Sequence, residues 1–133
     1  MEKKRTVLIV DDEERNVRLL TAMLSQENYN IVSALNGKDA LEMVDDMRPD
    51  LILLDVMMMG MNGFVICNKI KSNSKTSHIP VIMVTVLTGK EDRMKAMDAG
   101  ADDFLSKPLS RNELSVRVRS LIHSCQISRS ADS

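Results

Sequence analysis

The chain has 133 residues, of which 44% are hydrophobic and 28% are charged. This length and composition predict one globular domain. Eighteen basic residues against nineteen acidic ones leave a formal net charge of -1, which argues against direct binding to nucleic acid or to an anionic membrane surface.

The first half of the chain alternates between strand and helix patterns. A short β-branched run at 6–10 predicts a strand, and apolar residues at helical spacing predict a helix over 14–26. A second, weaker strand is predicted at 30–35. Asn36 then marks the start of a helix that ends before Pro49.

The middle of the chain repeats this alternation. The segment LILLD at 51–55 predicts the third strand, and PVIMVT at 80–85 predicts the fourth. Between them, Asn62 is the expected cap of a helix that carries several apolar side chains.

The last third of the chain adds one more strand between two helices. A helix is predicted over 89–99 and a short strand at 103–106, and Ser110 with Glu113 forms a capping box for the final helix. Hydrophobic periodicity is lost after Ser124, so the last residues are predicted to form a tail or linker.

Five strand–helix units in this order predict an α/β fold. Strands that are apolar on both faces and separated by helix-length segments are typical of a parallel sheet covered on both sides, with right-handed crossovers. In such sheets, functional residues gather at the carboxyl ends of the strands. The sequence therefore predicts a doubly wound parallel sheet with a site at that edge.

Polar side chains follow four of the predicted strands. Asp11 and Asp12 follow the first, Asp55 ends the third, Thr85 ends the fourth and Lys107 lies just past the fifth. If these strands are neighbours, the three carboxylates converge and raise one another's pKa unless positive charge compensates them. Lys107 and a divalent cation would supply that charge, and an all-oxygen site with several waters suits Mg²⁺.

Each of these residues also has a purely structural interpretation. Paired acids after a strand often form a loop and a helix cap, and a single threonine or lysine at a strand end is more often structural. Asp55 differs, because an acid at the end of a buried apolar strand must be paired, coordinated or neutral. Core packing does not require all of these groups at strand ends, so their coincidence favours a functional site.

No segment of the sequence predicts export or a membrane span. Cys67 and Cys125 lack CxxC or Cys/His ligand spacing, and the amino-terminal apolar run is too short for a signal peptide. The apolar stretch at 51–61 is interrupted by Asp55 and is shorter than the roughly 20 residues that a span needs. A reduced cytoplasmic setting is therefore predicted.

Four segments carry a resemblance to a known family. VLIVDDE, LILLDVMMMGMNGF, VIMVT and AGADDFLSKP, in this order and spacing, resemble the receiver domain of bacterial two-component response regulators over residues 5–124. The resemblance implies one flavodoxin-like (βα)5 domain with strand order 2-1-3-4-5, followed by a tail or linker at 125–133.

The resemblance also implies a metal-assisted phosphorylation site. Asp55 is the expected phosphoacceptor. Mg²⁺ is the expected cofactor, bound directly by Asp12, Asp55 and the backbone carbonyl of Met57, and through water by Asp11.

Further residues are implied to sense the phosphoryl group. Thr85 is expected to bind it and Lys107 to pair with its oxygens, and the Lys107–Pro108 peptide is expected to be cis. Phe104 corresponds to an aromatic switch that moves inward when Thr85 engages the phosphoryl group. The surface over 89–123 is then expected to transmit the signal.

The implied partner is a sensor histidine kinase or a phosphotransfer protein, as in a phosphorelay. Phosphorylation would change homodimerisation or a downstream output domain, with no direct role for nucleic acid or membrane. The implied catalysis is confined to the chain's own phosphorylation and dephosphorylation. RNVRLL and the segment from GADDFLSKP to SLI resemble the first receiver of multi-receiver diguanylate cyclase regulators, which favours part of a longer regulator over a stand-alone receiver.

Two positions depart from the family pattern. Met59 stands where proline is usual, and therefore keeps a backbone N–H and a looser turn. Val86 stands where a small residue is usual, and its methyl groups are expected near the phosphoryl pocket. Neither change removes a catalytic group.

Three other functions are alternatives to that of a receiver. A phosphatase of the haloacid dehalogenase type needs a second acid two residues after its nucleophile, where this chain has Met57. A nucleotide-binding site is disfavoured because GMNG matches neither GxGxxG nor GxxxxGK[ST]. An interaction module that signals without phosphorylation stays open as the alternative, although every acceptor residue is retained.

Overall fold

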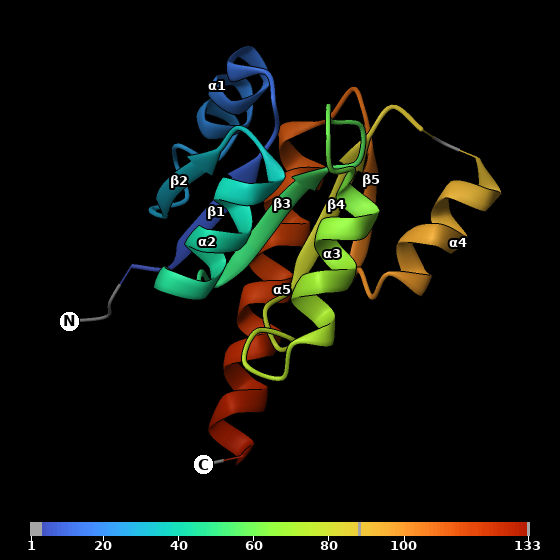
Figure 1. Ribbon diagram of the computed structural model, residues 1–133. Coiled ribbons are helices and arrows are strands. Elements are labelled where there is room, and N and C mark those ends of the chain that lie inside the picture. The colour runs from blue at the N-terminus through green and yellow to red at the C-terminus, as the bar shows by residue number, and fades with distance from the viewer. Residues whose placement is uncertain (1–3, 88, 133) are drawn as a thin grey trace.

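The computed structural model describes residues 4–87 and 89–132 as a five-stranded parallel sheet with helices on both faces (Figure 1). The strand order β2-β1-β3-β4-β5 confirms the predicted doubly wound α/β fold. The strands are β1 (Thr6–Val10), β2 (Asn30–Ala34), β3 (Leu51–Asp55), β4 (Val81–Thr85) and β5 (Asp103–Ser106). The helices are α1 (Glu14–Met23), α2 (Gly37–Met47), α3 (Gly63–Ser72), α4 (Lys90–Asp98) and α5 (Arg111–Asp132).

The central strands are buried on both faces. Along β1, Val7 and Ile9 pack into one core with residues of α5, whereas Leu8 and Val10 pack into a second core with residues of α2 and α3. Figure 1 shows α2 and α3 in front of the sheet and α5 behind it. Because successive side chains of a strand point to opposite faces, an unbroken apolar run is what a sheet between two helical layers requires.

The predicted caps at Asn62 and Ser110 are confirmed, and Asn36 caps α2 in the same way. Asn36, Asn62 and Ser110 each accept a hydrogen bond from the backbone amide three residues on, at 2.8, 3.0 and 3.1 Å. These side chains satisfy amide groups that the first helical turn leaves without a partner. The caps at Asn62 and Ser110 define where the chain turns away from β3 and β5 into the following helices.

The predicted end of the first helix is wrong. α1 ends at Met23 rather than at residue 26, and the chain continues in turns whose side chains meet α5. Leu24 is still buried after the helix ends. Glu27 accepts a hydrogen bond from Arg119 at 2.9 Å and one from Ser115. Packing against α5 therefore explains the apolar pattern beyond Met23.

Other boundaries differ less. The strands predicted at 30–35 and 80–85 are each one residue shorter, ending at Ala34 and beginning at Val81. α5 continues to Asp132 through the segment predicted to be a tail, and the domain boundary at 124 stays a prediction. Over the described parts of the chain, no helix combines the length and apolar character that crossing a bilayer requires.

Candidate functional site

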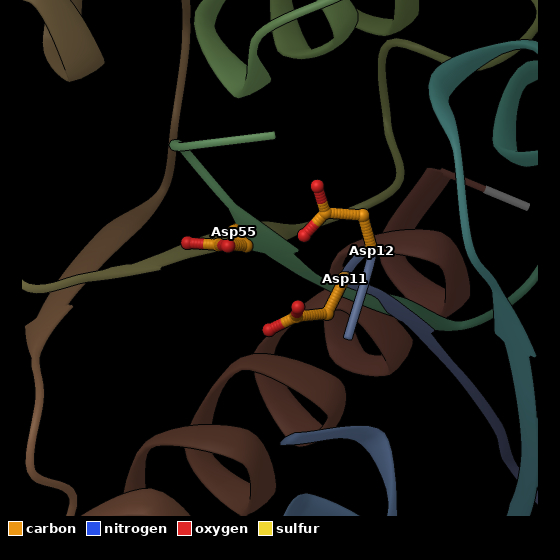
Figure 2. A group of neighbouring side chains, drawn as sticks. All are labelled: Asp11, Asp12 and Asp55. Carbon is orange, nitrogen blue, oxygen red and sulfur yellow. The ribbon is translucent and has the colours of Figure 1, made fainter. Parts of the chain in front are cut away.

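Three carboxylates meet at the carboxyl end of the sheet. Asp11 and Asp12 follow β1, and Asp55 is the last residue of β3. β1 and β3 are hydrogen-bonded neighbours, so their ends coincide. One oxygen of each side chain lies within 4.8 Å of the others (Figure 2). The convergence predicted from the sequence is therefore present.

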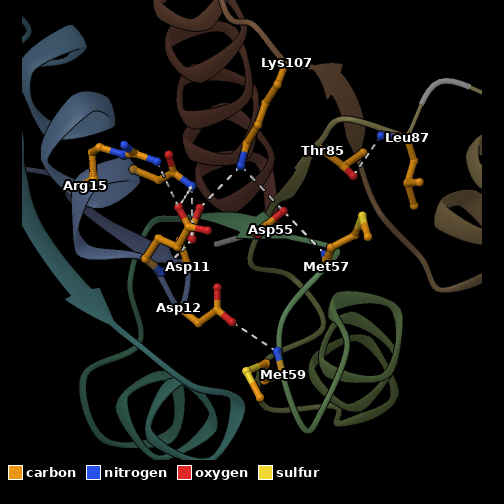
Figure 3. A network of polar contacts seen from close by, with 11 residues as sticks. Asp11, Asp12, Arg15, Asp55, Met57, Met59, Thr85, Leu87 and Lys107 are labelled. Atoms are coloured by element: carbon orange, nitrogen blue, oxygen red, sulfur yellow. Dashed lines mark hydrogen bonds and ion pairs between the residues drawn. The ribbon is translucent and has the colours of Figure 1, made fainter.

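Lys107 brings positive charge to this cluster from the end of β5. Its Nζ lies 3.5 Å from Asp11 Oδ2 and 3.7 Å from Asp55 Oδ1 (Figure 3). Its backbone N–H donates to the carbonyl of Thr85 at 2.8 Å, and the Lys107–Pro108 peptide is cis, as expected. The ammonium therefore lies between two of the carboxylates and partly neutralises both.

Thr85 is fully buried at the end of β4, beside Asp55. Asp55 is paired with Val84 in the sheet register, which places Thr85 one position further along the neighbouring strand. The Thr85 hydroxyl accepts a hydrogen bond from the backbone N–H of Leu87 at 3.1 Å. Because that bond uses the oxygen as an acceptor, the hydroxyl hydrogen can be donated to another group.

Burial is the main influence on the charge of Asp55. The residue is only 7% exposed, and the pKa of its carboxyl is raised from 3.8 to about 6, with burial as the largest cause. Lys107 and the backbone N–H of Met57, which lies 3.4 Å from Oδ1, lower this pKa, whereas the charges of Asp11 and Asp12 raise it. The ionised form of Asp55 is therefore held in the folded protein at a cost, and added positive charge would relieve that cost.

This pKa predicts a pH dependence of stability in the metal-free protein. The folded protein binds the Asp55 proton more tightly than the unfolded chain does. The stabilisation that comes from protonated Asp55 is therefore complete below pH 3.8 and is lost as the pH rises through about 6. Asp55→Asn, which cannot ionise, is expected to have a larger free energy of unfolding than wild type at pH 7, by at most about 3 kcal/mol.

Urea denaturation in the presence of a chelator, from pH 4 to pH 7, measures this difference. We expect the stabilisation by Asp55→Asn to be small at the acid end of the range and to grow towards pH 7. Asp46→Asn, which changes an exposed carboxylate on α2, should show no such growth. A stabilisation by Asp55→Asn that does not change with pH would contradict the assigned pKa.

The donor set fits a small, hard cation. The three clustered carboxylates supply oxygen atoms alone, Asp11 and Asp55 are buried, and Asp12 is half-buried. Such a set suits Mg²⁺, which takes few protein ligands and completes its shell with water or phosphate oxygens. The carbonyl of Met57 as a further ligand stays a prediction, since the contact that places Met57 here is its N–H bond to Asp55.

Three contacts at the site were not anticipated from the sequence. The N–H of Met59 donates to Asp12 Oδ2 at 3.1 Å. Asp11 Oδ1 accepts from the N–H of Glu13 at 2.9 Å and lies 3.5 Å from Asn16 Nδ2. The contact of Met59 depends on the path of a loop, which periodicity does not predict. The bond from Glu13 is a common local turn of Asp, and the sequence alone could have indicated it.

The expected switch residue lies on β5 and packs against the core that includes residues of α2 and α3. Phe104 is half-buried, and the guanidinium of Arg93 in α4 lies 5.6 Å from the centre of its ring. Both residues line an open groove of about 480 Å³ that also includes Met97 and Arg117. This groove lies within the surface over 89–123 for which the family resemblance implies a role in output.

A larger open groove adjoins the carboxylates. It measures about 750 Å³, and its lining includes Asp12, Met57, Phe64, Leu87 and Lys95. The groove thus runs from the acidic cluster between the loop after β3 and the start of α4. Val86 is 61% exposed, and its effect on the site stays a prediction.

The sequence matches a known family and several characterised proteins. The model of the response regulator receiver domain matches residues 7–119. Response regulator PleD of Caulobacter vibrioides is 50% identical over 115 residues, which are 86% of this chain and 25% of PleD. The DNA-binding dual master transcriptional regulator RpaA of Synechocystis is 34% identical over 116 residues, 87% of this chain and 48% of RpaA. The chain thus spans less than half the length of either relative.

Solved structures agree with this match. A signal receiver domain of a signal transduction histidine kinase from Syntrophus aciditrophicus has a TM-score of 0.84 at 32% identity, with 90% of this chain and 91% of that one covered. Chemotaxis protein CheY4 of Vibrio cholerae also has a TM-score of 0.84, at 27% identity, with 90% and 99% of the chains covered.

Proposed function

Because this chain belongs to the family of response regulator receiver domains, the phosphoacceptors of two-component signalling, we propose that Asp55 is the residue that accepts the phosphoryl group. The observation that carries this proposal is the position of the Asp55 carboxyl. It is buried at the end of β3, within 4.8 Å of two other carboxylates and 3.7 Å from the ammonium of Lys107.

The proposed reaction is a single transfer between two side chains. A carboxylate oxygen of Asp55 attacks the phosphorus of a phosphohistidine on the partner, and an acyl phosphate forms as the nitrogen–phosphorus bond breaks. The electron pair of the broken bond returns to the imidazole, which takes up a proton. Lys107 stabilises the charge that develops on the phosphoryl oxygens, because its ammonium already lies beside Asp55.

Asp12 and Asp55 would hold Mg²⁺ directly, with the carbonyl of Met57, while Asp11 would act through a bound water. The ion would neutralise charge shared between the carboxylates and the incoming phosphoryl oxygens. Asp11 is well placed for an indirect role, because its two oxygens already accept hydrogen bonds from Glu13 and Lys107.

Thr85 and Phe104 would couple phosphorylation to the output surface. The Thr85 hydroxyl would donate to a phosphoryl oxygen and move towards it, which would open space for the ring of Phe104. The ring would then leave the guanidinium of Arg93, now 5.6 Å away, and change the surface over 89–123. The charge added by phosphorylation would in this way shift Thr85 and Phe104 from one of two arrangements to the other.

The proposed partners are a sensor histidine kinase or a phosphotransfer protein, in the cytoplasm. Phosphorylation would then alter self-association or an output domain. We propose that the chain's catalysis is limited to its own phosphorylation and dephosphorylation. A role as part of a longer regulator accords with the lengths of the curated relatives.

Intact-mass measurement tests the proposed function. We expect the wild-type chain to gain the mass of one phosphoryl group from acetyl phosphate or a cognate kinase in Mg²⁺ buffer. Excess EDTA should prevent this gain, because the carboxylates repel the donor without a cation. Hydroxylamine should remove the added mass, since it cleaves acyl phosphates and leaves phosphoserine and phosphothreonine intact. No added mass with either donor would rule out the phosphoacceptor role.

A further inference from the structure

The loop after β3 reaches back to the metal site through a main-chain group. The backbone N–H of Met59 donates a hydrogen bond of 3.1 Å to Asp12 Oδ2 and so joins two residues that are 47 positions apart in the sequence. The Met59 residue is 88% exposed. The contribution of Met59 to the site therefore comes from its backbone.

Asp12 depends on this bond more than the other two carboxylates depend on any one contact. Asp11 accepts hydrogen bonds from Glu13 and Lys107, and Asp55 is held by Met57 and Lys107. For Asp12, Met59 is the donor that the described part of the chain provides. Asp12 is also the least buried of the three carboxylates, so packing restrains it less.

The bond leaves one oxygen of Asp12 for another partner. Figure 3 shows one carboxylate oxygen turned to the N–H of Met59, while the other points to the region between Asp11 and Asp55. A carboxylate held at one oxygen presents the second in a fixed direction. Hydrogen bonds of this kind orient metal ligands and typically change metal affinity by about 10- to 100-fold when they are removed.

We propose that Met59 is a positioning residue whose backbone N–H holds Asp12 in the orientation that binds a divalent cation. The inference rests on the proposed function for the identity of the metal ligands. The proposed role of Met59 is in binding of the divalent cation by the unphosphorylated protein. Any residue with a backbone N–H can donate this bond, whereas proline, the residue usual in the family at this position, cannot, because its ring nitrogen carries no hydrogen.

Calorimetric titration of the full unphosphorylated chain with Mg²⁺ tests the proposal. Met59→Leu keeps the N–H and replaces an exposed side chain, so its Kd for Mg²⁺ is expected to stay within about twofold of wild type. Met59→Pro removes the N–H, and its Kd is expected to rise by about tenfold. Equal Kd values for the two variants, or tighter binding by Met59→Pro, would overturn the proposal.

A second measurement does not depend on the proline variant. Amide hydrogen exchange of Met59, followed by NMR in the wild-type protein, reports the hydrogen bond directly. We expect the Met59 amide to stay protected when Mg²⁺ saturates the site. If Mg²⁺ binding releases this amide to fast exchange, the bond competes with the metal and the proposal is wrong.

Failure of the proposal for Met59 can be distinguished from failure of the proposed phosphoacceptor function. A wild-type chain that binds Mg²⁺ but takes up no phosphoryl group would overturn the phosphoacceptor role while leaving the role of Met59 to the titration. A chain that is phosphorylated at Asp55, with equal Mg²⁺ binding by Met59→Leu and Met59→Pro, would overturn the positioning role alone.

Discussion

Asp55→Asn is expected to take up no phosphoryl group under conditions in which the wild-type chain is fully phosphorylated. The substitution keeps the size of a residue that is 7% exposed at the end of β3, but replaces the proposed anionic nucleophile with a neutral amide. The loss should be complete rather than partial, because the roles proposed for the remaining site residues are to bind the phosphoryl group and not to attack it. Intact mass after incubation with acetyl phosphate in Mg²⁺ measures the effect.

Asp46→Asn is the matched control for this prediction. It makes the same chemical change at an exposed carboxylate of α2, and its phosphorylation should equal that of wild type. Thermal unfolding of both variants checks that the fold is intact. If Asp55→Asn still gains the mass of a phosphoryl group, peptide mapping would show which other residue accepts it, and the assignment of Asp55 would fail.

Gly63→Ala is expected to lower the free energy of unfolding by about 3 kcal/mol, at the upper end of the range for overpacking. A Cβ at this position would lie 2.4 Å from the carbonyl oxygen of Asp55 and 2.8 Å from the Cα of Val56. Both atoms belong to the backbone, so a side-chain rotation cannot relieve the contact. The end of β3 would have to move, together with the carboxyl of Asp55.

Gly60→Ala is the control that shows how much of the loss of stability comes from backbone conformation and how much from the close contact at Gly63. Gly60 has φ of +86°, and an added Cβ would meet nothing within 4 Å. The cost there comes from the left-handed backbone alone and is expected to be about 1 kcal/mol. Urea denaturation of the two variants gives the comparison. A loss for Gly63→Ala no greater than that for Gly60→Ala would show that the chain accommodates the close contact.

The central strands were predictable because both of their faces are buried. β1 and β3 begin and end at the predicted residues, since every side chain from Val7 to Val10 and from Leu51 to Leu54 enters one of the two cores. The end of α1 was not predictable from the same rule. Leu24 is buried by packing against α5, so its apolar character does not depend on the helix reaching it.

The part of the candidate site that is placed by the ends of the strands was predictable from the sequence. Asp11, Asp12 and Asp55 converge because parallel neighbouring strands end at the same edge of a sheet, and this follows from the alternation of elements. The path of the loop from Val56 to Asn62 depends instead on turn geometry and on the close packing of α3 against β3. A sequence pattern carries little of that information.

The exposure of Met59 has an evolutionary consequence. Natural substitution of its side chain would disturb little, because the residue is 88% exposed. The hydrogen bond to Asp12 comes from the main chain, so every amino acid with a backbone N–H can make it. A position of this kind would look unconstrained when judged by side-chain chemistry. Nineteen of the twenty genetically encoded amino acids retain the N–H, whereas proline, the residue usual in the family at this position, lacks it, so the hydrogen bond to Asp12 is a contact that receivers with proline here cannot make.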